Sequence, residues 1–406
     1  MKKIVCTLLI IILSVANIGF SECTKHYYVS QDGNDKNPGT IEKPFRSINV
    51  GVSNLMPGDQ LNIMGGIYYE MLEIKNSGTK NSPIVIKNYM DEDVIIDGSK
   101  NSISDDSSLI SIKDVSNIEI SGLVLRNLSS KNEVVPSAIF ISGSSKNITI
   151  ANNNIYGISN LGKAEERNAH GIAIYGDDEE TISNIKIANN KIHDNILGSS
   201  EALVVNGNVK EFYLIENEVF NNDNIGIDII AHEKVCPISK LDIPRLGQVK
   251  ENIVYNNRTD NNPSYYGDKS CAGIYIDGAI DNLIENNRVY YNNFGIEIGV
   301  ENQGHDVYGN TVSGNSIYYN DIAGFLIGGY EKKLGYARDN KIVGNLIYNN
   351  QLISKDGGEI ILHKSKENIF RDNKISKKDE DKTKHIEYWI EEKYAKDNVF
   401  INNQWK

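Results

Sequence analysis

The stretch that decides the fold runs from Gly273 to Asn302 and reads GIYIDGAIDNLIENNRVYYNNFGIEIGVEN. Its opening Gly-Ile-Tyr-Ile returns as Gly-Ile-Glu-Ile from Gly295, and apolar residues occupy every second position in both copies. This alternation is typical of a short β-strand that buries one face. A strand that returns after a short interval, with turns in between, indicates a solenoid in which each repeat forms one coil.

Similar runs recur along much of the chain. Each starts with a small residue, as in AIFIS, GIAIY, ALVVN, GIDII and GFLIG, which begin at Ala138, Gly171, Ala202, Gly226 and Gly324. The turns between the runs are rich in Asn, which tolerates left-handed backbone angles and can hydrogen-bond a neighbouring coil. The pattern therefore predicts an all-β fold, a right-handed parallel β-helix, in which most of these Asn residues are structural.

The N-terminus has the features of a secretory signal peptide over residues 1–21. Two lysines precede an apolar run, Ile4–Ala16, and small residues follow it. The run is short for a membrane span. We therefore expect the mature protein to be secreted, to the cell exterior or the periplasm, and to have no membrane anchor after cleavage.

We expect residues 22–406 to form one β-helix domain that acts as a monomer. An N-terminal cap is predicted over about 27–60, because four apolar residues fall there at helical spacing, namely Phe45, Ile48, Val52 and Leu55. The longest interruption of the repeat, 231–270, is predicted to be a loop insertion. Cys236 and Cys271 bracket it, and an exported protein could join them in a disulfide.

The formal net charge of the chain is −12. This charge disfavours nucleic acid and anionic membranes as partners. An anionic substrate would require a cation or a basic cluster between itself and the protein.

Two blocks carry a resemblance to known proteins. The first runs from YYVSQDGNDKNPGT at Tyr27 to YYEMLEI at Ile74, and continues in GTKNSPIVIKNY at Gly78 and VIIDGS at Val94. It resembles the N-terminal part of secreted polysaccharide lyase family 9 pectate lyases and the chondroitinase B-like group. The GIDII, GIYIDG and GIEIG series resembles bacterial parallel β-helix repeat proteins. This resemblance implies an exported enzyme that cleaves a uronic-acid polysaccharide by β-elimination, with calcium and a basic residue.

Acidic residues cluster on the outward face of three predicted strands. Counting along the alternation places Asp228, Asp277 and Glu297 on neighbouring coils, with Glu301 and Glu233 at the edge. Adjacent coils lie about 4.8 Å apart, so these carboxylates could approach a common point. Oxygen ligands of this kind suit calcium, and the sequence therefore predicts a calcium site. The alternative is a solvated polar face.

Other residues near this cluster suit catalysis and sugar binding. The candidate bases are Lys269, Lys234, His232 and Arg338, and the candidate substrate-binding residues are Tyr266, Tyr275, Tyr330 and Asn206. In the leading hypothesis, calcium neutralises a uronate and a base removes the adjacent proton. In a second, two of the carboxyl groups act as acid and base in a glycoside hydrolase. In a third, the solenoid is a non-catalytic carbohydrate-binding surface protein.

Overall fold

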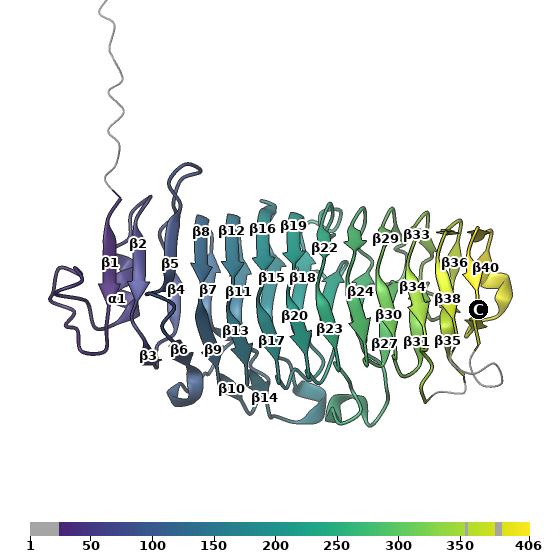
Figure 1. The fold of residues 1–406 in the computed structure, drawn as a ribbon, viewed down its shortest axis with the longest axis horizontal. Helices are drawn as coiled ribbons and strands as arrows, with labels where there is room; N and C mark the ends of the chain where they lie inside the picture. Colours follow the sequence, from purple (N-terminus) through teal and green to yellow (C-terminus); the bar gives the residue numbers. More distant parts are fainter. Residues whose placement is uncertain (1–23, 354–355, 378–383) are drawn as a thin grey trace, which may run out of the picture.

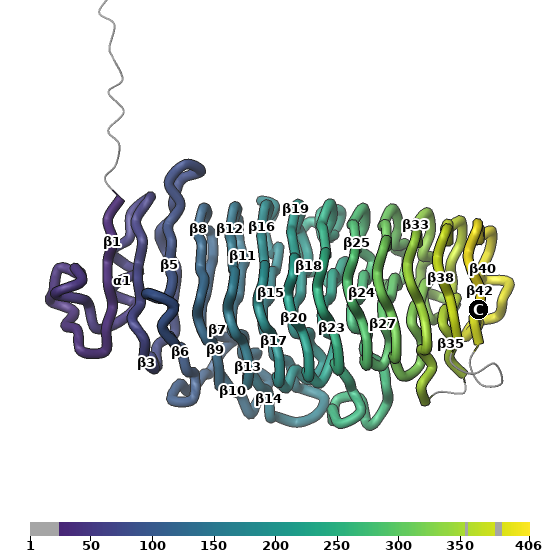
Figure 2. Tube along the Cα trace, in the orientation of Figure 1, coloured from purple at the N-terminus to yellow at the C-terminus, as the bar shows by residue number. Residues whose placement is uncertain are grey.

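The computed structural model describes residues 24–353, 356–377 and 384–406. The chain winds into a long stack of coils from β1 (His26–Val29) at one end to β42 (Gln404–Trp405) at the other (Figure 1). The tube trace shows the rungs side by side along the long axis (Figure 2). Neighbouring coils pair in parallel. The predicted fold, a right-handed parallel β-helix, is confirmed.

The coils of the described residues contribute strands to three long sheets. The second sheet runs from β1 to β41 (Val399–Ile401), and the third from β3 (Gly66–Tyr68) to β42. The first sheet is named the site sheet. It contains in spatial order β4 (Leu72–Ile74), β7 (Ser107–Lys113), β11 (Pro136–Ser142), β15 (His170–Gly176), β18 (Leu203–Gly207), β21 (Ile227–Ile230), β24 (Ala272–Asp277), β27 (Phe294–Gly299), β31 (Ala323–Ile327), β35 (Gly358–Leu362) and β39 (Ile386–Tyr388).

The core is a column of apolar side chains inside the coils. In the site sheet, one inward position is occupied by fully buried residues that pair from coil to coil, namely Leu203, Ile227, Ile274, Ile296 and Phe325. Burial of one such side chain contributes roughly 1.5–3 kcal/mol. The period-two pattern of the sequence therefore supplies the main stabilisation of the stack.

Buried Asn residues form ladders at the corners of the coils. In one ladder, the Asn287 side-chain oxygen accepts both the backbone N–H and the side-chain N–H of Asn252, each at 2.9 Å. The Asn287 side-chain nitrogen donates to the Val249 carbonyl and to Asn315 Oδ1, each at 2.9 Å. Because buried polar groups need partners, these contacts confirm that the recurrent Asn residues are structural.

The ladders also explain the small residue that opens each run. A Cβ on Gly273 would lie 2.5 Å from Val289 Cγ1 and 2.7 Å from the Asn292 side-chain nitrogen. A Cβ on Gly295 would meet Ile317 and Asn320 in the same way. Only a glycine at these two positions avoids a clash with the Asn side chains of the ladder.

A short helix lies at the N-terminal end, in the stretch expected to form a cap. The helix α1 (Ile48–Ser53) buries Ile48 and Val52, and packs against β1, β2 (Gln60–Ile63) and β4. Phe45 and Leu55 beside it are also buried. The helical spacing of these residues is therefore observed, whereas the capping role of the segment stays a prediction.

The predicted loop insertion over 231–270 is wrong in its extent. The segment contains β22 (Gln248–Lys250) and β23 (Ile253–Tyr255), which pair in the second and third sheets like the strands of any other coil. Val249 and Val254 point inward there, and ladder residues Asn252 and Asn257 follow the usual spacing. The interruption is thus two loops on either side of an ordinary pair of strands.

The predicted disulfide between Cys236 and Cys271 is not formed. Both thiols are free and buried. Cys236 Sγ contacts the Asp178 carbonyl at 3.4 Å, and Cys271 Sγ contacts the Asn257 carbonyl at 3.1 Å. The two strands between the loops hold the cysteines in separate parts of the coil. Their positions at the two ends of one sequence segment did not indicate this separation.

The predicted signal peptide, residues 1–21, lies outside the described residues. Within the described ranges, no helix has the length and apolar character needed to cross a membrane.

Candidate functional site

The outward side chains of the site sheet line up across the coils as predicted. One column contains Ala173, Val204, Asp228, Tyr275, Glu297 and Leu326. In the next column Asp277 pairs with Gly299. A register error of one residue would have turned all these side chains into the core. The predicted register is therefore confirmed, and the three acids project from one face.

Two of these acids are covered rather than exposed. Asp228 and Asp277 are only 2% and 4% exposed. Burial, and the negative charge of Glu201, raise the pKa of Asp228 well above its usual range. Burial, and the charge of Glu301, do the same to the pKa of Asp277, although its carboxylate accepts the Glu301 backbone N–H at 3.0 Å. The protonated, neutral forms of both groups are favoured.

Glu297, Glu301 and Tyr275 line one open cavity. The Tyr275 hydroxyl donates to Glu301 Oε1 at 3.4 Å. A Cβ built on Gly299 would lie 2.8 Å from the Tyr275 hydroxyl and 3.3 Å from Glu297 Oε1, so both atoms stand over this glycine. Because Gly299 has no side chain, the Tyr275 hydroxyl and the Glu297 carboxyl can occupy the space above it.

The pKa values of these two glutamates are both raised. Burial and the charge of Glu301 raise the pKa of Glu297 to about 8. The surrounding protein and the charge of Glu233 raise the pKa of Glu301, whereas the hydrogen bond from Tyr275 opposes that rise. Glu297 therefore holds its proton near neutral pH, and Tyr275 favours the ionised form of Glu301.

The cavity beside them has a volume of about 800 Å³ and aromatic walls. Tyr275 and Phe294 come from the strands of the site sheet, and Tyr330 and Trp389 from the segments that follow β31 and β39. Tyr330 is 47% exposed and Trp389 43% exposed. Exposed rings in a concave site offer apolar surface to a ligand.

His363 lines the same cavity and has no hydrogen-bond partner. Neither ring nitrogen finds a partner among the described residues, although the side chain is buried. Burial lowers the pKa of His363 to about 4, so the ring is uncharged near neutral pH. An unpaired buried polar group is costly, and here it could bond a ligand in the cavity.

The two lysines of the cavity are both held in ion pairs. Lys269 pairs with Asp260 and with Asp321, the latter at 3.3 Å, and Lys384 pairs with Glu387. Removal of a proton from substrate by Lys269 would require both of its ion pairs to rearrange. The predicted base is thus in the cavity but is already engaged.

The structure places other predicted residues away from this cavity. His232 and Lys234 line a smaller cavity, where the His232 ring stacks on His305 with centroids 3.6 Å apart. Arg338 pairs with Asp306 at 2.9 Å on a separate four-stranded sheet. These three predicted bases do not line the cavity with Glu297.

Three further predicted residues also lie outside the cavity. Tyr266 is 81% exposed on its loop. Glu233 is exposed and accepts a hydrogen bond from Asn302 at 2.7 Å. Asn206 is buried between the coils of Tyr175 and Ile230, and its side-chain oxygen has no partner among the described residues.

The predicted calcium ligands do not converge. Over the described ranges, no three His, Cys, Asp or Glu side chains are grouped so that they could hold one metal ion. The pairing gives the reason, because Tyr275 stands between Asp228 and Glu297 in their column, and Asp277 lies in the next column. Calcium takes six to eight oxygen ligands, and these residues do not fit that demand as they are arranged.

Sequence reasoning missed three residues of this face. Glu201 is buried, and burial raises its pKa to about 8. Glu201 precedes the ALVVN run directly, so its place beside the face could have been read from the strand pattern. His363 follows the alternating run GEIIL directly, so the strand pattern could have placed it beside the face as well. Trp389 had no such signal, because it follows a short strand outside the repeated pattern.

Comparisons with known proteins agree with the architecture. Residues 27–208 match the model of the Pel9A-like, right handed beta helix region, and residues 244–359 match that of the periplasmic copper-binding protein NosD. Pectate lyase PEL9 of Emericella nidulans is 41% identical over 73 residues, which is 18% of each chain. The GH136 lacto-N-biosidase of Eubacterium ramulus superposes with a TM-score of 0.65 at 16% identity, covering 94% of this chain and 67% of that one. This last likeness shows the fold alone.

A longer match covers most of the chain. The uncharacterized protein YwoF of Bacillus subtilis is 40% identical over 351 residues, which is 86% of this chain and 74% of YwoF. The chain therefore belongs to the same family as YwoF, and it has the right-handed parallel β-helix fold.

Proposed function

We propose that the protein is an exported glycoside hydrolase that cleaves a polysaccharide in the cavity lined by Glu297 and Glu301. One observation carries this proposal. Two carboxyl groups, one of them protonated near neutral pH, stand beside the Tyr275 hydroxyl in a cavity with aromatic walls. Hydrolysis of a glycosidic bond needs a carboxylic acid and a carboxylate that flank the bond.

The roles of the two glutamates follow from their surroundings. Glu297 donates its proton to the glycosidic oxygen, which makes the departing sugar a better leaving group. Glu301 acts as the carboxylate, and the hydrogen bond from Tyr275 favours its ionised form. Trp389 and Tyr330 offer ring surface to the sugars on either side of the bond.

The test is turnover by glutamine variants on a panel of plant and bacterial polysaccharides. Glu297→Gln should lower kcat by on the order of 10² to 10⁴-fold, because the amide keeps the shape but cannot donate the proton. Glu285→Gln is the matched control, since Glu285 pairs with Lys250 at 2.8 Å on the second sheet. Equal activity of Glu297→Gln and the parent would overturn the proposal.

A polysaccharide lyase is the second candidate, favoured by the match to the Pel9A-like model over 27–208. Such an enzyme would abstract a proton from a uronate and release an unsaturated product. The engaged Lys269 and the distant Arg338 weigh against it. An unsaturated product formed only with added calcium would favour the lyase over the hydrolase.

A further inference from the structure

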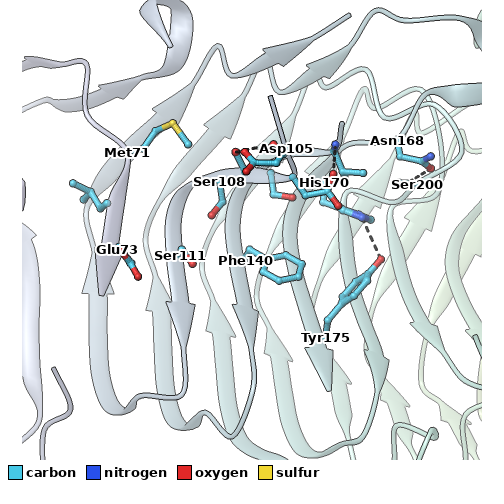
Figure 3. A pocket seen from close by; sticks show the side chains of 15 residues that line it. Met71, Glu73, Asp105, Ser108, Ser111, Phe140, Asn168, His170, Tyr175 and Ser200 are labelled. Carbon is cyan, nitrogen blue, oxygen red and sulfur yellow. Dashed lines mark hydrogen bonds between the residues drawn. The ribbon is translucent and has the colours of Figure 1, made fainter. Parts of the chain in front are cut away.

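A second cavity lies on the same face, toward the N-terminal end of the site sheet (Figure 3). Its volume is about 820 Å³. Glu73, Ser111 and Phe140 pair in register along its floor. The rings of Phe140 and Tyr175 lie 5.4 Å apart and give it an apolar surface. Cavities of this size, with aromatic surface and a few polar groups, are typical of ligand sites.

Three serine hydroxyls of this cavity are available to a ligand. Ser108, Ser111 and Ser137 line it, and their hydroxyls have no hydrogen-bond partner among the described residues. A serine hydroxyl can donate one hydrogen bond and accept two. A ligand rich in hydroxyl groups could therefore satisfy all three at once.

A histidine and a tyrosine add a polar group beside these serines. His170 Nδ1 lies 3.2 Å from the Glu201 backbone carbonyl. Its Nε2 lies 3.3 Å from the Tyr175 hydroxyl, a contact that Figure 3 shows. A carbonyl only accepts, so Nδ1 carries the proton and Nε2 accepts from Tyr175. Burial lowers the pKa of His170 to about 4, so the ring is uncharged near neutral pH. The Tyr175 oxygen can still accept a hydrogen bond.

The charged residues that line this cavity are all acidic. They are Glu73, Asp105 and Asp106, and no lysine or arginine of the described residues lines it. Glu73 is paired with Lys75 at 2.9 Å, so the negative charge comes mainly from the two aspartates. Asp106 accepts the Val135 backbone N–H at 2.8 Å, and Asp105 accepts from the Ser107 hydroxyl at 3.4 Å. A negative lining repels an anionic ligand. The cavity therefore disfavours a uronate and suits an uncharged sugar.

We propose that this cavity is a saccharide-binding site for an uncharged sugar residue, and that it holds the same polysaccharide chain that is cleaved beside Glu297. The second half rests on the proposed function. Phe140 and Glu297 stand in one column, five strands apart. At about 4.8 Å for each strand, the separation is about 24 Å, so a chain of several sugars could reach both cavities.

The test is a titration in the Glu297→Gln background, in which turnover is expected to be slow enough for binding to be measured. The probes are disaccharides and long oligosaccharides from cellulose, xylan, mannan and galactan, with oligogalacturonides and chitosan oligosaccharides as charged counterparts. Calorimetry measures affinity. Trp405→Phe is included in every protein, so that the fluorescence of Trp389 reports the Glu297 cavity. Two added changes, Phe140→Ala and Ser111→Leu, remove the ring surface and replace a hydroxyl on the cavity floor by a bulkier apolar side chain, and their melting temperatures are compared with that of the background.

We expect a long neutral oligosaccharide to bind at least tenfold more weakly after either change, with the Trp389 response to disaccharides unaltered. Unchanged affinity in both folded variants would overturn the proposal, as would binding of the charged probes alone or of no neutral probe. The results also distinguish a failure of the proposed function from a failure of this proposal. In the former case the parent binds a neutral oligosaccharide with dependence on Phe140 but does not cleave it.

Discussion

At the scale of single residues, the proposed chemistry depends on Glu297 keeping its proton near neutral pH. Water is displaced from this carboxyl by the walls of the cavity, and Glu301 brings a second negative charge near it. Both effects penalise the ionised form. An isolated glutamate on a solvated face would be ionised at neutral pH and could not act as a general acid.

The same surroundings predict how stability depends on pH. Between about pH 6.5 and 8, Glu297 and Glu201 keep their protons in the folded state, with pKa values of about 8, but are ionised in the unfolded chain. The folded state then binds more protons, so stability must fall as pH rises through this window. The buried His170 and His363 act in the opposite direction near pH 6.5, because they are neutral in the folded state, with pKa values of about 4, but partly charged in the unfolded chain. Their effect is smaller, since the unfolded imidazole loses most of its charge early in this window.

Melting temperature measured across that window tests this prediction. The parent should melt at a lower temperature at pH 8 than at pH 6.5, and the double variant Glu201→Gln with Glu297→Gln should show a smaller change. A flat profile in the parent would mean that the two carboxyls are ionised in the folded protein.

At the scale of single elements, the Asn ladders decide where each coil turns. Every ladder residue satisfies groups in the coils before and after it, so one substitution disturbs three coils. Asn287→Ala would leave the Asn252 backbone N–H and side-chain N–H buried without an acceptor. At about 1–3 kcal/mol for each unpaired group, we expect a loss of roughly 2–6 kcal/mol in unfolding free energy.

Chemical denaturation and hydrogen exchange can measure this loss. Exchange should quicken first in β26 (Arg288–Tyr290) and its neighbours, since repeat proteins open locally. The exposed Asn261 provides the control, and Asn261→Ala should change little. A loss no greater than that of the control would show that the ladder is dispensable.

Much of this element-scale order could be read from the sequence. Two-residue alternation gave the strand register, and the coil interval gave the stacking, because both follow from local geometry. The strands at Gln248 and Ile253 were missed, since they are short and lie between irregular loops. The separation of Cys236 and Cys271, and the cover over Asp228 and Asp277, depend on how distant loops fold back. No local pattern encodes those distances.

At the scale of the whole molecule, the stacked coils form a rigid scaffold that presents residues from distant coils on one face. His363 and Trp389 reach the Glu297 cavity from coils near the C-terminal end of the stack, and the second cavity (Figure 3) is lined by strands nearer the N-terminal end. Binding sites held on a rigid scaffold lose little entropy when the ligand arrives. A long, stiff polysaccharide is a substrate that suits such a face.

The nature of the product tests the central claim most directly. The polysaccharide that the parent cleaves is digested in water enriched in heavy oxygen, and the fragments are weighed by mass spectrometry. Hydrolysis at Glu297 and Glu301 adds water across the bond, so each new reducing end should carry the heavy isotope. Fragments that lack the isotope and contain an unsaturated sugar would contradict the account and identify a lyase.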